Sequence, residues 1–89
     1  MVRLFIRHKV QDYAAWRKGY DDFESARIKL GARGHDVFRD VDDGNDVTAC
    51  HDFDSLDAAK AFVNSFELKT AMQTAGVVGA PTIWFTHPA

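Results

Sequence analysis

The chain has 89 residues and a formal net charge of −2, so it lacks the strongly basic surface of nucleic-acid-binding proteins. Apolar residues make up 46% and charged residues 27%, which is typical of a globular protein, and we expect one domain over residues 1–89. Arg3 and Arg7 interrupt the N-terminal apolar run, which argues against a signal sequence or a membrane span. Cys50 is the only cysteine, so it excludes an internal disulfide and fits a reducing cytoplasm.

The first strand is predicted over residues 2–10, where apolar and polar side chains alternate and Leu4, Ile6 and His8 share one face. Asp12 is a credible N-cap for the helix that follows. Large apolar residues then recur at helical spacing and form one stripe: Tyr13, Trp16, Tyr20, Phe23 and Leu30. Glycines 31 and 34 are expected to end this helix.

A hairpin is predicted in the middle of the chain, with strands at 35–41 and 46–53 joined by a tight turn at 42–45 that contains Asp-Gly. The register of this hairpin is open at this stage. A two-residue loop would place His51 opposite Asp36, where a carboxylate would fix the imidazole tautomer and raise its basicity. A slip by one residue would place His51 opposite Val37 instead.

The second helix is expected to begin at Asp54 or Ser55 and to break or restart near Ser65, because Asn64 and Ser65 have low helix propensity. The last strand is predicted over 82–87, with Trp84 on one face and Ile83 and Phe85 on the other.

The order β-α-β-β-α-β predicts an α+β, ferredoxin-like fold with an antiparallel sheet of strand order 4-1-3-2. Both helices then lie on one face of the sheet. The other face would carry Phe5 together with Trp84 or Phe85, which would be exposed without a cover. We therefore expect a second copy of the chain to cover that face and to complete a dimeric α/β barrel.

At this point the chain resembles the antibiotic-biosynthesis-monooxygenase-like proteins of the dimeric α/β-barrel superfamily. The resemblance rests on the element order and on these local features: Asp12-Tyr13 with Trp16, the 42–45 hairpin, the segment 65–72, residues 75–77, and Pro81. It implies a homodimer formed by two facing sheets and a ligand pocket between each sheet and its own helices. Proteins of this type include cofactor-independent oxygenases acting on polycyclic phenols, haem-degrading enzymes, isomerases and cyclases. No catalytic set of any branch can be matched residue by residue.

His8 and His51 are the candidate catalytic residues, because both share a face with aliphatic side chains and a neutral imidazole there can act as general base on a phenol. The alternative is a buried histidine bonded to backbone or to a carboxylate. The antiparallel arrangement predicts roughly 10 to 15 Å between them, too far for one metal ion, so no metal site is expected. Arg7 is expected to pair with a carboxylate such as Asp52 or one of a partner subunit.

The candidate ligand pocket consists of aromatic and thioether side chains at helical spacing: Trp16, Tyr20, Phe62, Phe66 and Met72. They would wall a cavity for a flat aromatic molecule or simply fill the core.

Three functions remain open. The first is a cofactor-independent oxygenase, cyclase or isomerase that acts on a small aromatic or polyketide-like substrate without flavin or nicotinamide. The second is a non-catalytic homodimeric module that binds a small molecule or has a filled pocket. The third is haem binding and degradation. A closed core below about 100 Å³ would favour the inert module, because ligand sites usually exceed about 300 Å³.

Overall fold

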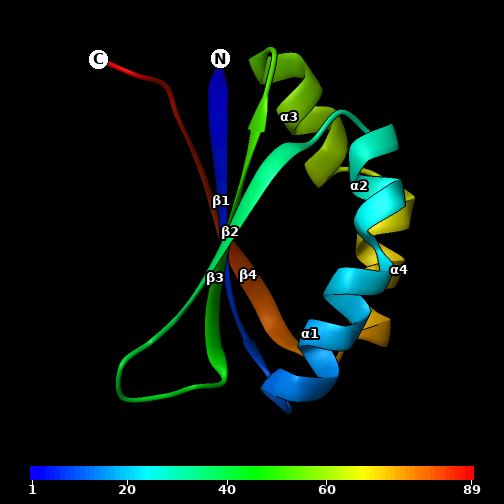
Figure 1. Cartoon of the computed structure of the whole chain (residues 1–89), viewed down its shortest axis with the longest axis vertical. Coiled ribbons are helices and arrows are strands. Elements are labelled where there is room, and N and C mark those ends of the chain that lie inside the picture. The colour runs from blue at the N-terminus through cyan, green and yellow to red at the C-terminus, as the bar shows by residue number, and fades with distance from the viewer.

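The computed structural model describes residues 1–89 and contains one four-stranded sheet. Its strands are β1 Val2–Val10, β2 Arg33–Arg39, β3 Asp46–Phe53 and β4 Val77–Thr86. They are ordered β2-β3-β1-β4 and every neighbouring pair is antiparallel (Figure 1). This is the predicted order 4-1-3-2 read from the other edge, so the ferredoxin-like α+β fold is confirmed.

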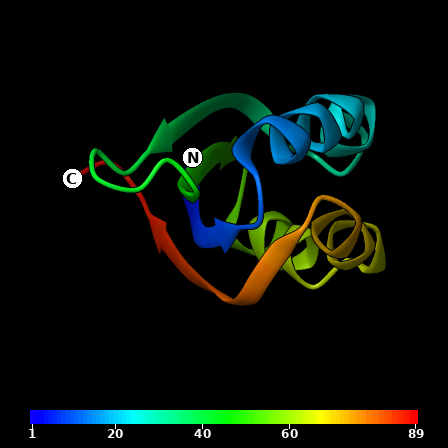
Figure 2. The same cartoon turned by 90° about the horizontal axis from the view of Figure 1, so that it is seen from below.

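Four helices cover one face of the sheet in two consecutive pairs (Figure 2). They are α1 Tyr13–Asp22, α2 Glu24–Lys29, α3 Leu56–Val63 and α4 Phe66–Thr74. The expected break near Ser65 is confirmed and separates α3 from α4. The break at Phe23, which separates α1 from α2, was not predicted, because its apolar side chain continues the helical stripe.

At the starts of α1, α3 and α4, side chains accept hydrogen bonds from the free backbone donors of the first turn. Asp12 accepts from the amide of Ala15 at 3.0 Å, as predicted. Ser55, rather than Asp54, accepts from the amide of Ala58 at 3.1 Å. Ser65 accepts from the amide of Leu68 and donates to the carbonyl of Phe62, so it stabilises the junction of two helices at once.

Three sequence predictions need correction. β2 begins at Arg33, two residues earlier than expected, and ends at Arg39. β4 begins at Val77 instead of residue 82, because it is an edge strand that tolerates Pro81, and Gly79, with φ of 74°, lies beside a register shift. The connection between β2 and β3 is not a tight turn with positive φ angles. The Asp40 carboxylate holds it by accepting from two following amides.

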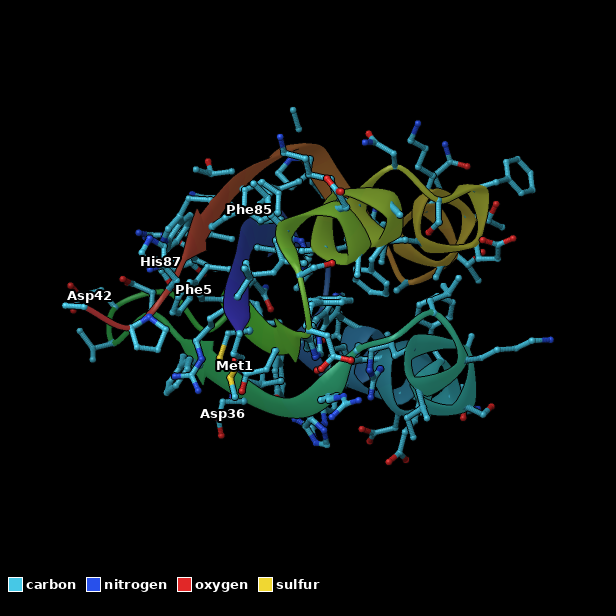
Figure 3. All side chains as sticks on the ribbon, turned by 90° about the horizontal axis from the view of Figure 1, so that it is seen from above. Met1, Phe5, Asp36, Asp42, Phe85 and His87 are labelled. Carbon is cyan, nitrogen blue, oxygen red and sulfur yellow. The ribbon has the colours of Figure 1, made fainter.

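The core lies between the sheet and the helices, where Leu4, Phe53 and Phe62 are almost completely buried. The opposite sheet face has no layer over it. There the rings of Phe5 and Trp84 stack with centroids 5.1 Å apart, and Trp84 remains 39% exposed. Phe5 points away from the helices, and the loop carrying Asp42 and the C-terminal segment at His87 project on the same side (Figure 3). Trp84, not Phe85, is therefore the large aromatic of β4 on the open face.

Candidate functional site

A small cavity of about 50 Å³ lies between the sheet and the two helix pairs. Its wall is largely apolar, and its polar side chains are His8, Tyr20, Arg27 and His51. Four of the five predicted pocket residues line it, namely Trp16, Tyr20, Phe62 and Met72. Phe66 does not: it is 78% exposed on the outer side of α4, because Ser65 restarts the helix and changes the phase of the apolar stripe.

His51 lies on β3 with 3% of its surface exposed, and both of its ring nitrogens have partners. Nδ1 lies 3.1 Å from the carbonyl oxygen of Gly34, which can only accept, so Nδ1 carries the proton. Nε2 is then an acceptor, and the Tyr20 hydroxyl donates a hydrogen bond to it at 3.2 Å. The fold thus fixes the tautomer of His51 and the orientation of Tyr20.

Both predicted registers for His51 are wrong, and with them the proposed pair between His51 and Asp36. Asp36 faces Cys50 and Val37 faces Ala49, while a bulge on β2 leaves Gly34 and His35 together opposite His51. The φ of 58° at Gly34 is the left-handed conformation that glycine adopts without strain. His51 consequently bonds to a backbone carbonyl in place of a carboxylate.

Burial keeps the polar pair in the cavity uncharged at neutral pH. The pKa of His51 falls to about 4, mainly because burial disfavours the imidazolium, with a further contribution from the nearby Arg27 charge. Burial raises the pKa of Tyr20 to about 12 in spite of the opposing effect of Arg27. The hydrogen bond between them therefore joins two neutral groups.

His8 differs from His51 because neither of its buried ring nitrogens has a hydrogen-bond partner. Its ring is 7% exposed and meets the ring of Trp16 edge-on at 5.7 Å. Burial lowers its pKa, so the ring is neutral and offers one donor and one acceptor. His8 pairs with Val47 and His51 pairs with Leu4 across the sheet, which separates the two histidines by four residues, or about 13 Å.

Arg27 is a cavity residue that the sequence analysis missed. Its side chain is 4% exposed, its guanidinium lies 3.8 Å from the centroid of the Tyr20 ring, and Nη1 donates to the Tyr20 carbonyl. No carboxylate oxygen lies within 4.0 Å of its nitrogens. The sequence could have indicated its burial, because Arg27 follows Trp16, Tyr20 and Phe23 at helical spacing and so falls on the apolar stripe.

A larger groove of about 440 Å³ lies outside the cavity, between α1 and α4. The groove and the cavity share four wall residues: Gly19, Phe23, Ala71 and Ala75. Phe66 borders the groove, which is where the structure places this predicted pocket residue. A Cβ atom on Gly19 would lie 3.1 Å from the Cβ of Ala75, so the missing side chain lets α1 and α4 approach closely. We call this contact the α1/α4 seam.

Arg7 forms an ion pair, as expected, but its partners are Asp46 at 2.7 Å and Asp40 at 3.8 Å. Asp52 pairs with Arg3 at 2.9 Å instead, because Arg3 lies directly opposite it in the register of β1 and β3. Cys50 is a buried free thiol whose pKa is raised by burial.

No group of three His, Cys, Asp or Glu side chains has a spacing that suits a metal ion. None of the helices has the length and apolar character needed to cross a membrane.

No protein-family model matches this chain, and no curated protein matches it. Solved structures do. A Bordetella bronchiseptica protein provisionally described as an antibiotic biosynthesis monooxygenase is 14% identical and superimposes with a TM-score of 0.85 over 99% of this chain and 96% of its own. SnoaB, a cofactor-independent oxygenase from Streptomyces nogalater, is 13% identical with a TM-score of 0.79 over 99% of this chain and 92% of its own. A conserved protein from Methanosarcina mazei Go1 is 10% identical with a TM-score of 0.76 over 99% and 92% of the two chains. The expected fold is therefore that of antibiotic biosynthesis monooxygenase structures.

Proposed function

We propose that this chain binds a small aromatic phenol in the helix–sheet cavity and acts on it as a cofactor-independent, oxygenase-like enzyme. The observation that carries this proposal is the pair of unpartnered nitrogens on buried His8. A buried polar group without a partner costs about 1–3 kcal/mol, so its retention beside a cavity calls for a purpose. A bound ligand with a hydroxyl group would satisfy His8 and recover that cost.

His8 is the base in this proposal, and His51 is a positioning residue. Both nitrogens of His51 are already engaged, by Gly34 and Tyr20, so it has no free site for a substrate proton. The neutral ring of His8 has a free nitrogen that accepts a phenol proton. The resulting phenolate donates electrons to O₂ more readily than the phenol does.

The oxygenase step needs no further oxidant or reductant. One oxygen atom of O₂ replaces both hydrogens of a ring methylene as C=O, and the other leaves with those hydrogens as water. The four electrons that O₂ accepts all come from the substrate carbon. Cyclisation or isomerisation of a similar substrate would use the same proton acceptor without O₂.

The small cavity volume favours the non-catalytic module for the molecule in this conformation. At about 50 Å³ it lies below the 100 Å³ limit set above and holds one or two water molecules. Binding of an aromatic ligand therefore requires the cavity to enlarge, and we propose that α1 and α4 part, which would join the cavity to the groove outside the seam. A porphyrin is far larger than the cavity of about 50 Å³, so the cavity gives no support to haem binding.

We also propose that the partner of this chain is a second copy bound through the open sheet face. The stacked pair of Phe5 and Trp84 and the 54% exposed Phe38 leave a broad apolar surface there. Ion pairs within the chain neutralise the arginines of the same face, including Arg3 with Asp52, which lowers the cost of covering them. The free, buried thiol of Cys50 is consistent with a reducing cytoplasm as the compartment.

The experiment titrates 2-naphthol into the protein while the ring resonances of His8 and Trp16 are followed by NMR, and then measures O₂ uptake with 1,8-dihydroxyanthrone. We expect saturable binding that weakens about tenfold in His8→Phe, the equivalent of one hydrogen bond. His87→Phe, at an exposed position, is the matched control. Binding without O₂ uptake above the protein-free rate would favour the non-catalytic module, and absence of binding would refute the phenol site.

A further inference from the structure

Arg27 is the only residue with a formal charge at neutral pH in the wall of the helix–sheet cavity. The other polar side chains there, His8, Tyr20 and His51, are neutral at that pH because burial lowers the histidine pKa values and raises that of the tyrosine. The acids nearest along the helices, Asp21 and Glu24, are exposed and form no ion pair with Arg27. The cavity therefore carries one positive charge that no carboxylate contacts directly.

A buried guanidinium without a carboxylate is unfavourable unless something compensates its lost hydration. The face of the Tyr20 ring at 3.8 Å and one carbonyl oxygen supply part of that compensation. The guanidinium has five N–H donors, and its only hydrogen bond within the protein goes to that carbonyl. Its other nitrogens retain some contact with solvent, since the only buried side-chain nitrogens without a partner are those of His8. Its remaining donors form a planar fork whose preferred partner is an anionic oxygen group.

The carbonyl of Tyr20 does not explain why the arginine is there. This oxygen also accepts the amide of Phe23 at 3.2 Å, so it would remain hydrogen-bonded without Arg27. An apolar side chain of the same length would fill the space without the desolvation cost. If Arg27 served only to stabilise the fold, an apolar residue at this position would stabilise it more.

We propose that the cavity ligand carries an anionic oxygen group, a carboxylate or a phenolate, which Arg27 binds as its counter-ion. This inference rests on the proposed function, since it concerns the same cavity. It adds that the ligand is charged and has two polar ends.

The two ends follow from the arrangement of the elements. α2, which carries Arg27, lies beside the part of the sheet where β1 begins, and α1 reaches the part where β1 ends, near His8 (Figure 1). Between them the stacked rings of Trp16 and Tyr20, 4.9 Å apart, form an aromatic wall. The favoured ligand is therefore a flat aromatic acid with a hydroxyl group at the end opposite its charge.

The test compares three probes at neutral pH: 6-hydroxy-2-naphthoate, 2-naphthol, and a nitro-substituted 2-naphthol that is ionised at this pH. We expect at least one anionic probe to bind at least tenfold more tightly than neutral 2-naphthol. The naphthoate arm reports a carboxylate ligand and the nitronaphthol arm a phenolate ligand. Equal affinity of all three probes would overturn the inference while leaving the phenol site intact, whereas no binding of any probe would count against the proposed function itself.

Arg27→Met should abolish the preference for the anionic probes over 2-naphthol. Arg27→Lys should retain a preference of reduced size, since it keeps the charge and loses the fork. Arg33→Gln, at an exposed arginine, is the matched control and should change nothing. Urea unfolding provides a readout independent of any ligand: Arg27→Met should have a midpoint equal to or above that of the wild type. A clearly lower midpoint, or an unchanged anion preference in Arg27→Met, would assign Arg27 a structural role.

Discussion

The hydroxyl of Tyr20 lies 3.2 Å from Nε2 of His51, and this contact joins the helix layer to the sheet at the cavity. It continues through Nδ1 of His51 to the carbonyl of Gly34, at the bulge of β2. One neutral hydrogen-bonded path thus links α1, β3 and β2. The side chains of this path have no spare donor for a ligand, although the Tyr20 hydroxyl oxygen can still accept a hydrogen bond. The free donors in the cavity wall are therefore those of His8 and Arg27.

Tyr20→Phe should lower the free energy of unfolding by about 1–3 kcal/mol, because it leaves Nε2 of buried His51 without a donor. His51→Phe should also destabilise, since the Tyr20 hydroxyl and the Gly34 carbonyl lose a partner. The double variant should lose less than the sum of the two, with a coupling of about 0.5–3 kcal/mol measured by urea unfolding. Strict additivity would show that the contact contributes nothing to stability.

The stability of the protein should fall as the pH decreases from about 6.5 to about 4 through His51. The folded protein holds His51 neutral down to its pKa of about 4, whereas the unfolded chain takes up the proton near the ordinary value of 6.5. The unfolded state therefore binds more protons in this window, and the free energy of unfolding decreases by up to about 3 kcal/mol as the pH drops. Above pH 7 this residue contributes no pH dependence.

The measurement is urea unfolding between pH 4.5 and 8 for the wild type and for His51→Phe. The difference between the two curves isolates His51 from the carboxylates and from His8, whose lowered pKa acts in the same direction. Between pH 4.5 and 6.5, the difference in unfolding free energy should change by up to about 1.4 kcal/mol per pH unit, which corresponds to the uptake of one proton on unfolding. Parallel curves would contradict a neutral buried His51.

Much of the fold could be predicted from the sequence because its signals are local. Alternation set β1 and β3 to within a residue, and the side chains of Asp12, Ser55 and Ser65 marked three helix starts. The predictions were wrong where contacts between distant segments determine the local structure. The break at Phe23 and the long β4 through Gly79 depend on pairing and packing that no local pattern records.

The candidate site was predictable in part for a related reason. Strand alternation placed His8 and His51 on the helix-covered face, and both are buried there. The partner of His51 was not predictable, because the connection between β2 and β3 sets a register in which Asp36 faces Cys50, and the bulge at Gly34 then brings a carbonyl to His51. Arg27 escaped notice because charged residues on a helix are usually solvated, and only packing shows this one to be buried.

Ser65→Ala should destabilise the protein by about 1 kcal/mol, because Ser65 caps α4 and also donates to the last turn of α3 through a 2.7 Å bond. Ser25→Ala is the matched control, since Ser25 is exposed within α2 and makes no side-chain hydrogen bond. Thermal or urea unfolding should separate the two variants clearly. Equal stability of both would mean that the junction between α3 and α4 does not depend on its cap.

Trp84→Glu should convert the proposed homodimer to a monomer, because it places a charge beside Phe5 in the apolar part of the open sheet face. Sedimentation should give about twice the 10.0 kDa chain mass for the wild type and the single-chain mass for the variant. Phe66→Glu is the control, because Phe66 is an exposed aromatic on the helix side and should leave the mass unchanged. A wild type that stays monomeric at high concentration would rule out the pairing.

Crosslinking the α1/α4 seam should close the cavity to ligands. Gly19→Cys with Ala75→Cys, in a Cys50→Ala background, places two thiols where the Cβ positions are 3.1 Å apart. A disulfide spans about 3.5–4.5 Å between Cβ atoms, so the helices need to part by only a few tenths of an ångström to form it. The oxidised variant should bind 2-naphthol at least tenfold more weakly than the same variant after reduction, because the cavity of about 50 Å³ then cannot merge with the groove outside it. Equal binding in both redox states would show that ligands reach His8 by another path, or that the cavity enlarges without separating α1 from α4.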